Sequence, residues 1–195
     1  MFEPIRRLRP LRPYLTLLGL LSLVLLPALT VAPVTGQEQA EPKDRGASSG
    51  LVLPRFATTR STPINVRVGP GTKYEVAWIY LKAGVPVEIV QEFDTWRKIR
   101  DIDGSEGWVH QNLLAGTRAG YVAADGDTSL RASESDDSSA RAVLGKGFRI
   151  QIKECDGVWC EVTAINQPEG ERSSSYSGYL HQGDIWGVYP NEKFD

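Results

Sequence analysis

Two cysteines, Cys155 and Cys160, are the only thiol-bearing residues of this 195-residue chain, and between them lies the turn-forming pair Asp156-Gly157. A redox pair typically has two residues between its cysteines at the start of a helix, whereas these have four. A zinc site would need two further ligands. A four-residue loop between paired strands would instead place the cysteines opposite each other, within the reach of a disulfide. We therefore expect a structural disulfide that closes a hairpin.

The two histidines, His110 and His181, stand in related segments, GWVHQ at 107–111 and GYLHQ at 178–182. Since they occupy equivalent places in separate segments, we do not expect them to converge on one metal or one catalytic centre. We expect each histidine to lie in a short turn, where its imidazole bonds to the backbone. A nucleophile beside a base is not recognisable, and the carboxylates lie on polar turns rather than in apolar surroundings that would raise a pKa. We predict no enzyme, no metal and no cofactor.

The segment INVRVGPGTKY at 64–74 places glycines beside Lys73, as a phosphate-binding loop does. Such a loop needs a hydroxyl residue after the lysine and then a helix, but Tyr74 follows here and a strand comes next. Pro70 and Gly71 suit the two central positions of a type II turn, the second of which needs a positive φ. We expect these glycines to turn the chain.

Residues 1–36 have the organisation of an export signal: four arginines near the start, a long apolar stretch, and small residues before Gln37. If it is not cleaved, the apolar stretch is long enough to anchor the protein, and this is the only membrane contact we expect. Its removal changes the net charge from −2 to −5. Neither half of the remainder has a basic stripe with interleaved aromatic residues, so we predict no nucleic-acid binding. The predicted location is periplasmic or secreted.

The rest of the chain divides by composition. Residues 37–52 are polar, small and charged, with too little apolar surface to offset the entropy of folding, and predict a flexible tether. From Pro54 onward, short β-branched and aromatic runs alternate with turn residues, and no amphipathic helical period persists. The fold class is therefore all-β.

The second half of the all-β region repeats the first. The segment from Gly84 to Gln111 aligns with the segment from Gly147 to Gln182. The matched pairs are Gly84 and Gly147, Val87 and Ile150, Ile89 and Ile152, Trp96 and Trp159, Ile99 and Val162, and, upstream, Arg67 and Arg131. A repeat at this spacing predicts two copies of one small domain.

The first copy resembles the bacterial SH3-like domain family. The motifs that carry the resemblance are Asn65-x-Arg67-x-Gly69-Pro70-Gly71, Trp96-Arg97-Lys98-Ile99, and Gly107-Trp108-Val109-His110 followed by Leu113-Leu114. The resemblance implies a small, strongly bent sheet that forms a partly open barrel. We predict such a domain at 53–117, a second at 120–189, and a short tail at 190–195. The second copy lacks Gly-Pro-Gly and has a longer loop, so there the prediction rests partly on the repeat.

The matching tryptophans are the main candidates for ligand contact. Strand side chains alternate between faces, so if Ile99 and Val162 point into the barrels, Trp96 and Trp159 point outward. The resemblance implies a ligand groove on that side, although each indole could instead cover a secondary cluster under a loop. Arg67 could hold a ligand carboxylate or pair with an acid of its own domain. The full candidate set is Trp96, Trp159, Tyr74, Arg67, Trp108 and Tyr179.

Three functions remain open. The first is an exported, non-catalytic module that binds peptide-like material of the cell envelope, and the resemblance implies peptidoglycan peptides or protein segments as ligands. The second is a structural or adaptor protein whose outward aromatic residues dock on a partner protein or against the other repeat. The third is a thiol protein that uses Cys155 and Cys160 for redox exchange or metal binding, and the resistance of their bond to reductant would separate it from the others.

Overall fold

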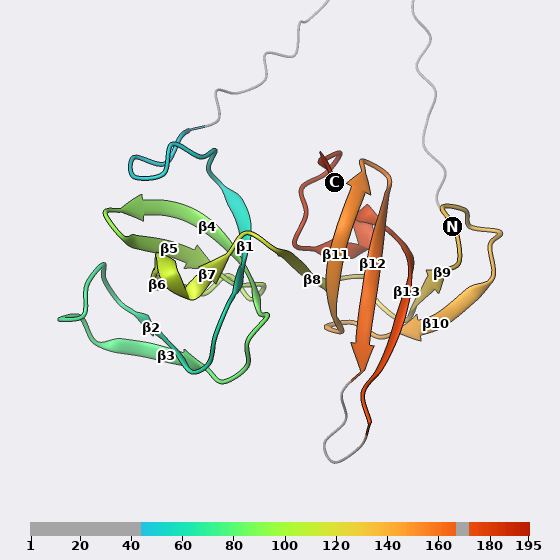
Figure 1. Cartoon of the computed structure of the whole chain (residues 1–195), viewed down its shortest axis with the longest axis horizontal. Helices are drawn as coiled ribbons and strands as arrows, with labels where there is room; N and C mark the ends of the chain where they lie inside the picture. The colour runs from blue at the N-terminus through green and yellow to red at the C-terminus, as the bar shows by residue number, and fades with distance from the viewer. Residues whose placement is uncertain (1–43, 167–171) are drawn as a thin grey trace, which may run out of the picture. The chain divides into compact units, whose positions relative to one another are not determined.

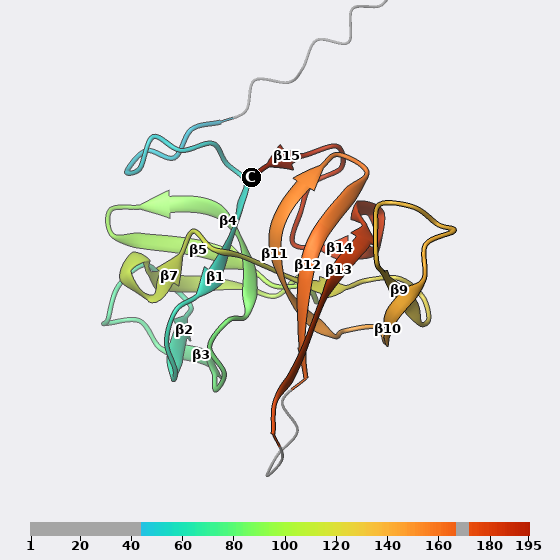
Figure 2. The same cartoon turned by 45° about the vertical axis from the view of Figure 1, so that its right-hand side comes forward.

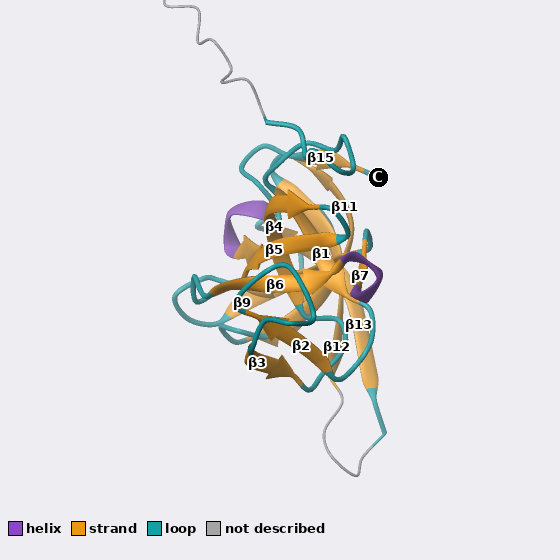
Figure 3. Ribbon diagram, turned by 90° about the vertical axis from the view of Figure 1, so that its left-hand side faces the viewer, coloured by secondary structure: helices purple, strands orange, loops and turns teal. Residues whose placement is uncertain are grey.

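The computed structural model describes residues 44–166 and 172–195, which belong to one compact unit, and almost all regular structure in it is β-strand (Figure 1). The predicted signal segment and the first part of the predicted tether lie outside the described residues. Helical structure in the described part is limited to two short 3-10 turns, η1 (Gln111–Leu113) and η2 (Gln182–Asp184) (Figure 3). Within these same ranges, no helix has the length and apolar character needed to cross a membrane.

The strands form two antiparallel sheets with the same connectivity. The first sheet has the order β3-β2-β6-β5-β4-β1-β7, and the second has the order β10-β9-β13-β12-β11-β8-β14. The first contains β1 (Arg55–Thr59), β2 (Ile64–Arg67), β3 (Val76–Tyr80), β4 (Pro86–Phe93), β5 (Trp96–Arg100), β6 (Glu106–His110) and β7 (Leu114–Ala115). The second contains β8 (Arg118–Val122), β9 (Thr128–Arg131), β10 (Ala140–Leu144), β11 (Arg149–Asp156), β12 (Trp159–Asn166), β13 (Ser174–His181) and β14 (Ile185–Trp186), and β15 (Lys193–Phe194) pairs with β11. The tandem all-β architecture predicted from the repeat is confirmed.

The matched positions of the repeat have matched roles. Val87 and Ile150 are both buried, as are Ile99 and Val162, and each of the four residues belongs to the core of its own barrel. Gly84 and Gly147 have φ values of 78° and 79°, in the left-handed region that favours glycine. The two copies therefore share their core positions. They also share a glycine turn, which comes before β4 in the first copy and before β11 in the second.

The predicted disulfide is confirmed. Cys155 on β11 and Cys160 on β12 are cross-strand partners, and their sulfurs are bonded. Both residues are buried in the core of the second barrel. A buried bond between paired strands is shielded from attacking thiols, which disfavours a redox role.

The two barrels contact each other around strand β1. The Thr58 hydroxyl donates to the Thr117 carbonyl (2.6 Å) and accepts the Ala119 N–H (3.1 Å). The Phe56 ring packs against Trp186 and Tyr189, with ring centroids 5.2 and 4.8 Å apart. The hydrogen bonds of Thr58 and the aromatic contacts of Phe56 together hold the two barrels in contact.

One further bond closes this junction. The Tyr189 hydroxyl donates to the Glu88 carboxylate of the first barrel (2.9 Å). Burial and this carboxylate raise the pKa of the Tyr189 phenol, so it remains a neutral donor.

The tether prediction is wrong for its described part, residues 44–52. Arg45 and Val52 form an isolated bridge, so this segment folds back on itself. The Glu92 carboxylate of β4 accepts the Ser48 N–H (3.1 Å), the Ser49 N–H (2.8 Å) and the Ser49 hydroxyl (2.7 Å). Composition alone missed this, because the group that orders the segment is a buried carboxylate more than 40 residues away.

The predicted tail, residues 190–195, includes the short strand β15. Phe194 pairs with Cys155 and Lys193 with Asp156, so the end of the chain adds a short strand to β11. The Phe194 ring lies under the Arg118 guanidinium, with the central carbon 4.5 Å from the ring centroid. Strand pairing and a cation–π contact both hold Phe194 in place. Neither contact can be predicted from the sequence of residues 190–195 alone.

Glu92 generates a prediction about stability in acid. Its side chain is fully buried and bonds Arg55 (2.7 Å) and Arg97 (3.3 Å). Burial alone would raise the pKa of this carboxyl, but the bonds from Ser49 and Arg55 and the charge of Arg97 lower it to about 2. Because the pKa is lowered from 4.5 in the unfolded chain, its contribution of about 3 kcal/mol is present above pH 4.5 and is lost as the pH falls toward 2.

We expect E92Q to lower the free energy of unfolding at pH 7 by about 3 kcal/mol, because Arg55 and Arg97 lose a buried partner. Between pH 5 and pH 3 the variant should lose less stability than the wild type. Urea unfolding at each pH measures both effects, and E106Q, at a part-exposed carboxylate, is the matched control. Equal acid sensitivity of E92Q and the wild type would contradict this role.

The disulfide generates a second prediction. Replacing Cys155 and Cys160 together by alanine should lower the stability by about 2 kcal/mol, since the bond closes only a short loop. The fold should persist, because the strand register continues on both sides of the bond. Urea unfolding and far-ultraviolet circular dichroism measure the two quantities, and an unfolded double variant at neutral pH would show that the bond does more than constrain the hairpin.

Candidate functional site

The two matched tryptophans lie on the outer face of the central strand of each sheet. Trp96 on β5 is paired with His110 on β6, and Trp159 on β12 is paired with His181 on β13. Both indoles are half-buried and neither belongs to a barrel core. In the first copy the rings meet edge to face at 5.7 Å, whereas in the second they stack at 3.8 Å. An indole and an imidazole therefore form an outward aromatic pair at the same place in each copy.

The alternation of β5 places these groups as expected. Ile99 is fully buried and Arg97 is 5% exposed, so both face inward, and Arg97 bonds the Gln111 side chain and the Asp94 carbonyl. Trp96 and Lys98 are half-exposed on the other side. The outward orientation predicted for Trp96 is thus present in the structure, while its contact with a ligand stays a prediction.

Strand register brings further predicted residues onto the same face. Trp108 is the cross-strand partner of both Lys98 and Arg67 in the first copy. In the second copy Tyr179 is the partner of both Glu161 and Arg131. Trp108 is only 9% exposed, whereas Tyr179 is half-buried. Trp108 therefore supports the face more than it offers surface to a ligand.

Arg67 and Arg131 each brace a turn. Arg67 donates from Nη1 to the Tyr74 carbonyl (2.6 Å), and Arg131 donates from Nη1 to the Ser138 carbonyl (2.8 Å). Neither arginine forms an ion pair within the described ranges, so the expected partnership with an acid of its own domain is not seen there. Each guanidinium fixes the turn that follows the second strand of its copy.

Tyr74 lies over the turn that Arg67 braces. Gly71 donates its N–H to the Gly69 carbonyl (3.0 Å), and Tyr74 donates its N–H to the Gly71 carbonyl (3.2 Å). The glycines turn the chain, as predicted, but the type II turn is wrong, since Gly71 has no positive φ. Glycine is required for space instead: a Cβ on Gly69 would lie 2.6 Å from an atom of the Tyr74 ring.

The histidines have structural partners in both copies. His110 accepts the Asn112 N–H at Nδ1 (3.3 Å) and so caps η1, which is the predicted backbone contact. His181 instead bonds the Asp136 carboxylate through Nε2 (2.8 Å). Among residues 44–166 and 172–195, no three His, Cys, Asp or Glu side chains are grouped so that they could hold a metal ion.

The two faces differ in charge at their centres. Lys98 in the first copy bonds Glu106 (2.5 Å), and the position that corresponds to Lys98 in the second copy is Glu161, which bonds Lys153 (2.8 Å). Hydrogen bonds from Lys98 and Arg100 hold the pKa of Glu106 below its usual value. The central charge is therefore opposite in the two copies.

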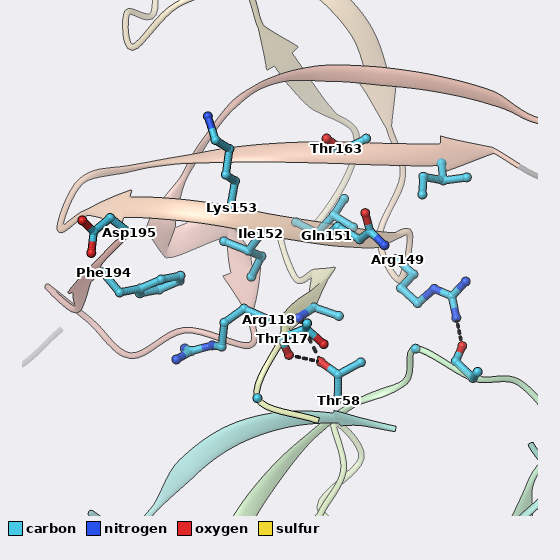
Figure 4. Close-up of a pocket in the computed structure, with 16 residues that line it drawn as sticks. Thr58, Thr117, Arg118, Arg149, Gln151, Ile152, Lys153, Thr163, Phe194 and Asp195 are labelled. Carbon is cyan, nitrogen blue, oxygen red and sulfur yellow. Dashed lines mark hydrogen bonds between the residues drawn. The ribbon is translucent and has the colours of Figure 1, made fainter. Parts of the chain in front are cut away.

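Two cavities lie on the second barrel. One of about 420 Å³ is bordered by Trp159 and Glu161 on one side and by Phe194 on the other. The second, of about 910 Å³, is a crease between the barrels, with Thr58 of the first barrel facing Ile152 and Thr163 of the second (Figure 4). Sequence reasoning missed the crease, because its walls come from segments that only the packing of the two copies brings together.

The close packing at Gly69 generates a prediction. We expect G69A to displace the Tyr74 ring and to lower the stability by about 1–2 kcal/mol, because the added methyl overlaps the ring. In G71A the added methyl would lie 3.4 Å from the same ring, which is an ordinary contact, so this variant is the matched control. Proton resonances of the Tyr74 ring and thermal unfolding measure the effects, and equal behaviour of the two variants would contradict this packing.

Comparison with known proteins identifies the first sheet. Residues 60–116 match the family of bacterial SH3 domains. No curated protein matches the chain. Solved structures with similarity include NlpC2 and NlpC1 from Trichomonas vaginalis, with 12% and 14% identity and TM-scores of 0.28 and 0.29. The similarity covers 68% and 72% of this chain but 48% of each of those chains, so the chain spans about half their length, and at these scores it carries no argument about function.

Proposed function

Since residues 60–116 form a bacterial SH3 domain, we propose that the chain is a non-catalytic binding module for extended, peptide-like segments of the cell envelope. The observation that carries this proposal is the outward aromatic pair, Trp96 with His110 and Trp159 with His181, at the same place in two barrels. An aromatic surface flanked by hydrogen-bonding groups suits the apolar and polar parts of an extended peptide.

The partial exposure of Trp96 and Trp159 favours a role in binding over a role in filling the barrel core. A barrel of about 60 residues has few large side chains to spare, and those needed for its stability lie in its core. Trp96 and Trp159 stay half-exposed and outside the two core clusters. Two such faces in one chain would bind a polymeric ligand more tightly than either alone, through effective concentration.

Binding without catalysis is part of the proposal. The reactive side chains near the aromatic pairs already have partners: His110 caps η1, His181 bonds Asp136, and the cysteines are bonded to each other. A nucleophile needs an adjacent base with the correct geometry, and each of these bonds takes up one of the two ring nitrogens of its imidazole.

The disulfide and the bacterial SH3 domain together indicate an extracytoplasmic protein, because disulfides persist in oxidising compartments. The proposed location is the periplasm or the exterior, reached through the signal in residues 1–36. There the ligands would be peptidoglycan peptides or segments of envelope proteins.

A second candidate function is an adaptor that docks on a partner protein. It is favoured by the exposed apolar side chains on and beside β3, the edge strand of the first sheet: Val68 (60% exposed), Val76 (41%), Ile79 (49%) and Leu81 (76%). An unpaired edge with apolar neighbours is suited to strand addition by another chain.

The aromatic faces generate a binding prediction. Alanine at Trp96 or at Trp159 should weaken the binding of purified muropeptides about tenfold, and the double change should abolish cosedimentation with cell-wall sacculi. Tryptophan fluorescence titration and sedimentation measure these effects.

The control is Y176A, which removes an exposed aromatic ring from the opposite side of the β12–β13 hairpin and should leave binding unchanged. Unchanged fluorescence of the wild type at millimolar muropeptide and at millimolar protein-derived peptide would refute the proposal. Loss of a partner protein in V76E and L81E, with wild-type wall binding, would favour the adaptor function.

A further inference from the structure

Strand β12 carries a continuous outward row that ends far from Trp159. Cys160, Val162 and Ala164 are buried, so the alternating residues Trp159, Glu161, Thr163 and Ile165 form the outer row. The β12–β13 hairpin extends well beyond the rest of its sheet (Figures 1 and 2). From Trp159 to Ile165 the strand rises about 20 Å, the length of a six-residue extended peptide.

The two cavities of the second barrel lie one after the other along this row. Trp159 and Glu161 line the smaller cavity, whereas Thr163 and Ile165 line the crease. Phe194 and Asp195 border both cavities. A single extended ligand can therefore enter both at once.

The Trp159 end of the row is acidic. Four carboxylates besides that of Asp195 line the smaller cavity, and Lys193 is the one lysine or arginine that lines it. They belong to Glu134, Glu154, Asp156 and Glu161. Glu134 and Glu154 form no ion pair within the described ranges. However, the pKa of Lys153 is raised by its hydrogen bond to Glu161 and also by the charge of Glu154. The His181 ring stacks on the Trp159 indole, so the aromatic ring that lines this cavity is held in place.

The crease end of the row is basic. Arg118, Arg149 and Lys153 line it, and Asp195 is its one acidic lining residue (Figure 4). Arg118 bonds Glu192 and Lys153 bonds Glu161. Arg149 lines the crease and donates to the Ala83 carbonyl of the first barrel, and within the described ranges it forms no ion pair that would neutralise its charge.

We propose that β12 binds an extended peptide in one orientation, with a basic side chain against Trp159 and Glu154 and a carboxylate in the crease beside Arg149. This proposal rests on the proposed binding function and adds the charge and direction of the ligand. A cation gains from an aromatic ring and from carboxylates, and a carboxylate gains from a guanidinium. A nucleic acid or an anionic membrane would be repelled by the acidic end.

The test uses a peptide with a single charge at each end: acetylated lysine, two serine-alanine repeats and a C-terminal glycine with a free carboxylate. Its matched forms carry a C-terminal amide, norleucine in place of lysine, or no serine-alanine repeats. Binding to the full chain is measured by tryptophan fluorescence, for the wild type and for R149Q, E154Q and the control K146Q, whose lysine lies on a loop outside both cavities.

In the wild type, the amide, the norleucine form and the short form should each bind about threefold more weakly than the parent, as expected for solvent-exposed charge pairs. In R149Q the parent and the amide should bind equally, and in E154Q the parent and the norleucine form should bind equally. K146Q should match the wild type. Thermal unfolding confirms that R149Q, which loses a bond to Ala83, is folded.

The outcomes separate the two proposals. Binding of all peptides with equal affinity, unaffected by R149Q and E154Q but lost in W159A, would overturn the oriented groove and leave the binding function standing. Failure of every peptide and of muropeptides to bind the wild type would overturn the binding function itself. Tighter binding to single-stranded nucleic acid or to anionic vesicles than to the peptide would overturn the charge assignment.

Discussion

The inward packing of one side of each central strand determines what the other side presents to solvent. Ile99 and Val162 are fully buried at the centres of their barrels, and because strand side chains alternate, Trp96 and Trp159 have no place in the core. Each barrel is too small to cover both faces of its sheet. The outward aromatic pairs, and every proposal about ligands, depend on this constraint.

Polar groups with distant partners hold the rest of the molecule in place. Glu92 binds the 44–52 segment to the first barrel, and Thr58 joins the barrels by accepting the Ala119 N–H. The turns are fixed in a related way, by a guanidinium that reaches a carbonyl seven residues away in Arg67 and again in Arg131. The proposed binding surface therefore lies on barrels whose polar contacts are largely internal.

The features that could be predicted from sequence are those with local or repeated signals. Alternation around Trp96, the hairpin between Cys155 and Cys160, and the duplication marked by Gly84 and Gly147 all follow from spacing and residue type. The bacterial SH3 resemblance was carried by the motifs of the first copy, and the family match covers that same region.

What sequence reasoning missed depends on contacts between distant segments. The ordering of residues 44–52 needs Glu92, and the pairing of Phe194 needs β11. The pair Pro70-Gly71 predicted a positive φ at Gly71, which the structure does not show. The glycine that this turn requires is Gly69, because a side chain there would overlap the Tyr74 ring. The crease beside Arg149 exists only because the two copies pack together.

The bond between Cys155 and Cys160 has a mechanical consequence. It joins β11 to β12 at the end of the hairpin next to Trp159. A force applied to that end of β12 would pass to the neighbouring strand through a covalent link, so the hairpin would not unzip from there one hydrogen bond at a time. Strand β5, which carries Trp96, is joined to β4 by strand pairing without a covalent link.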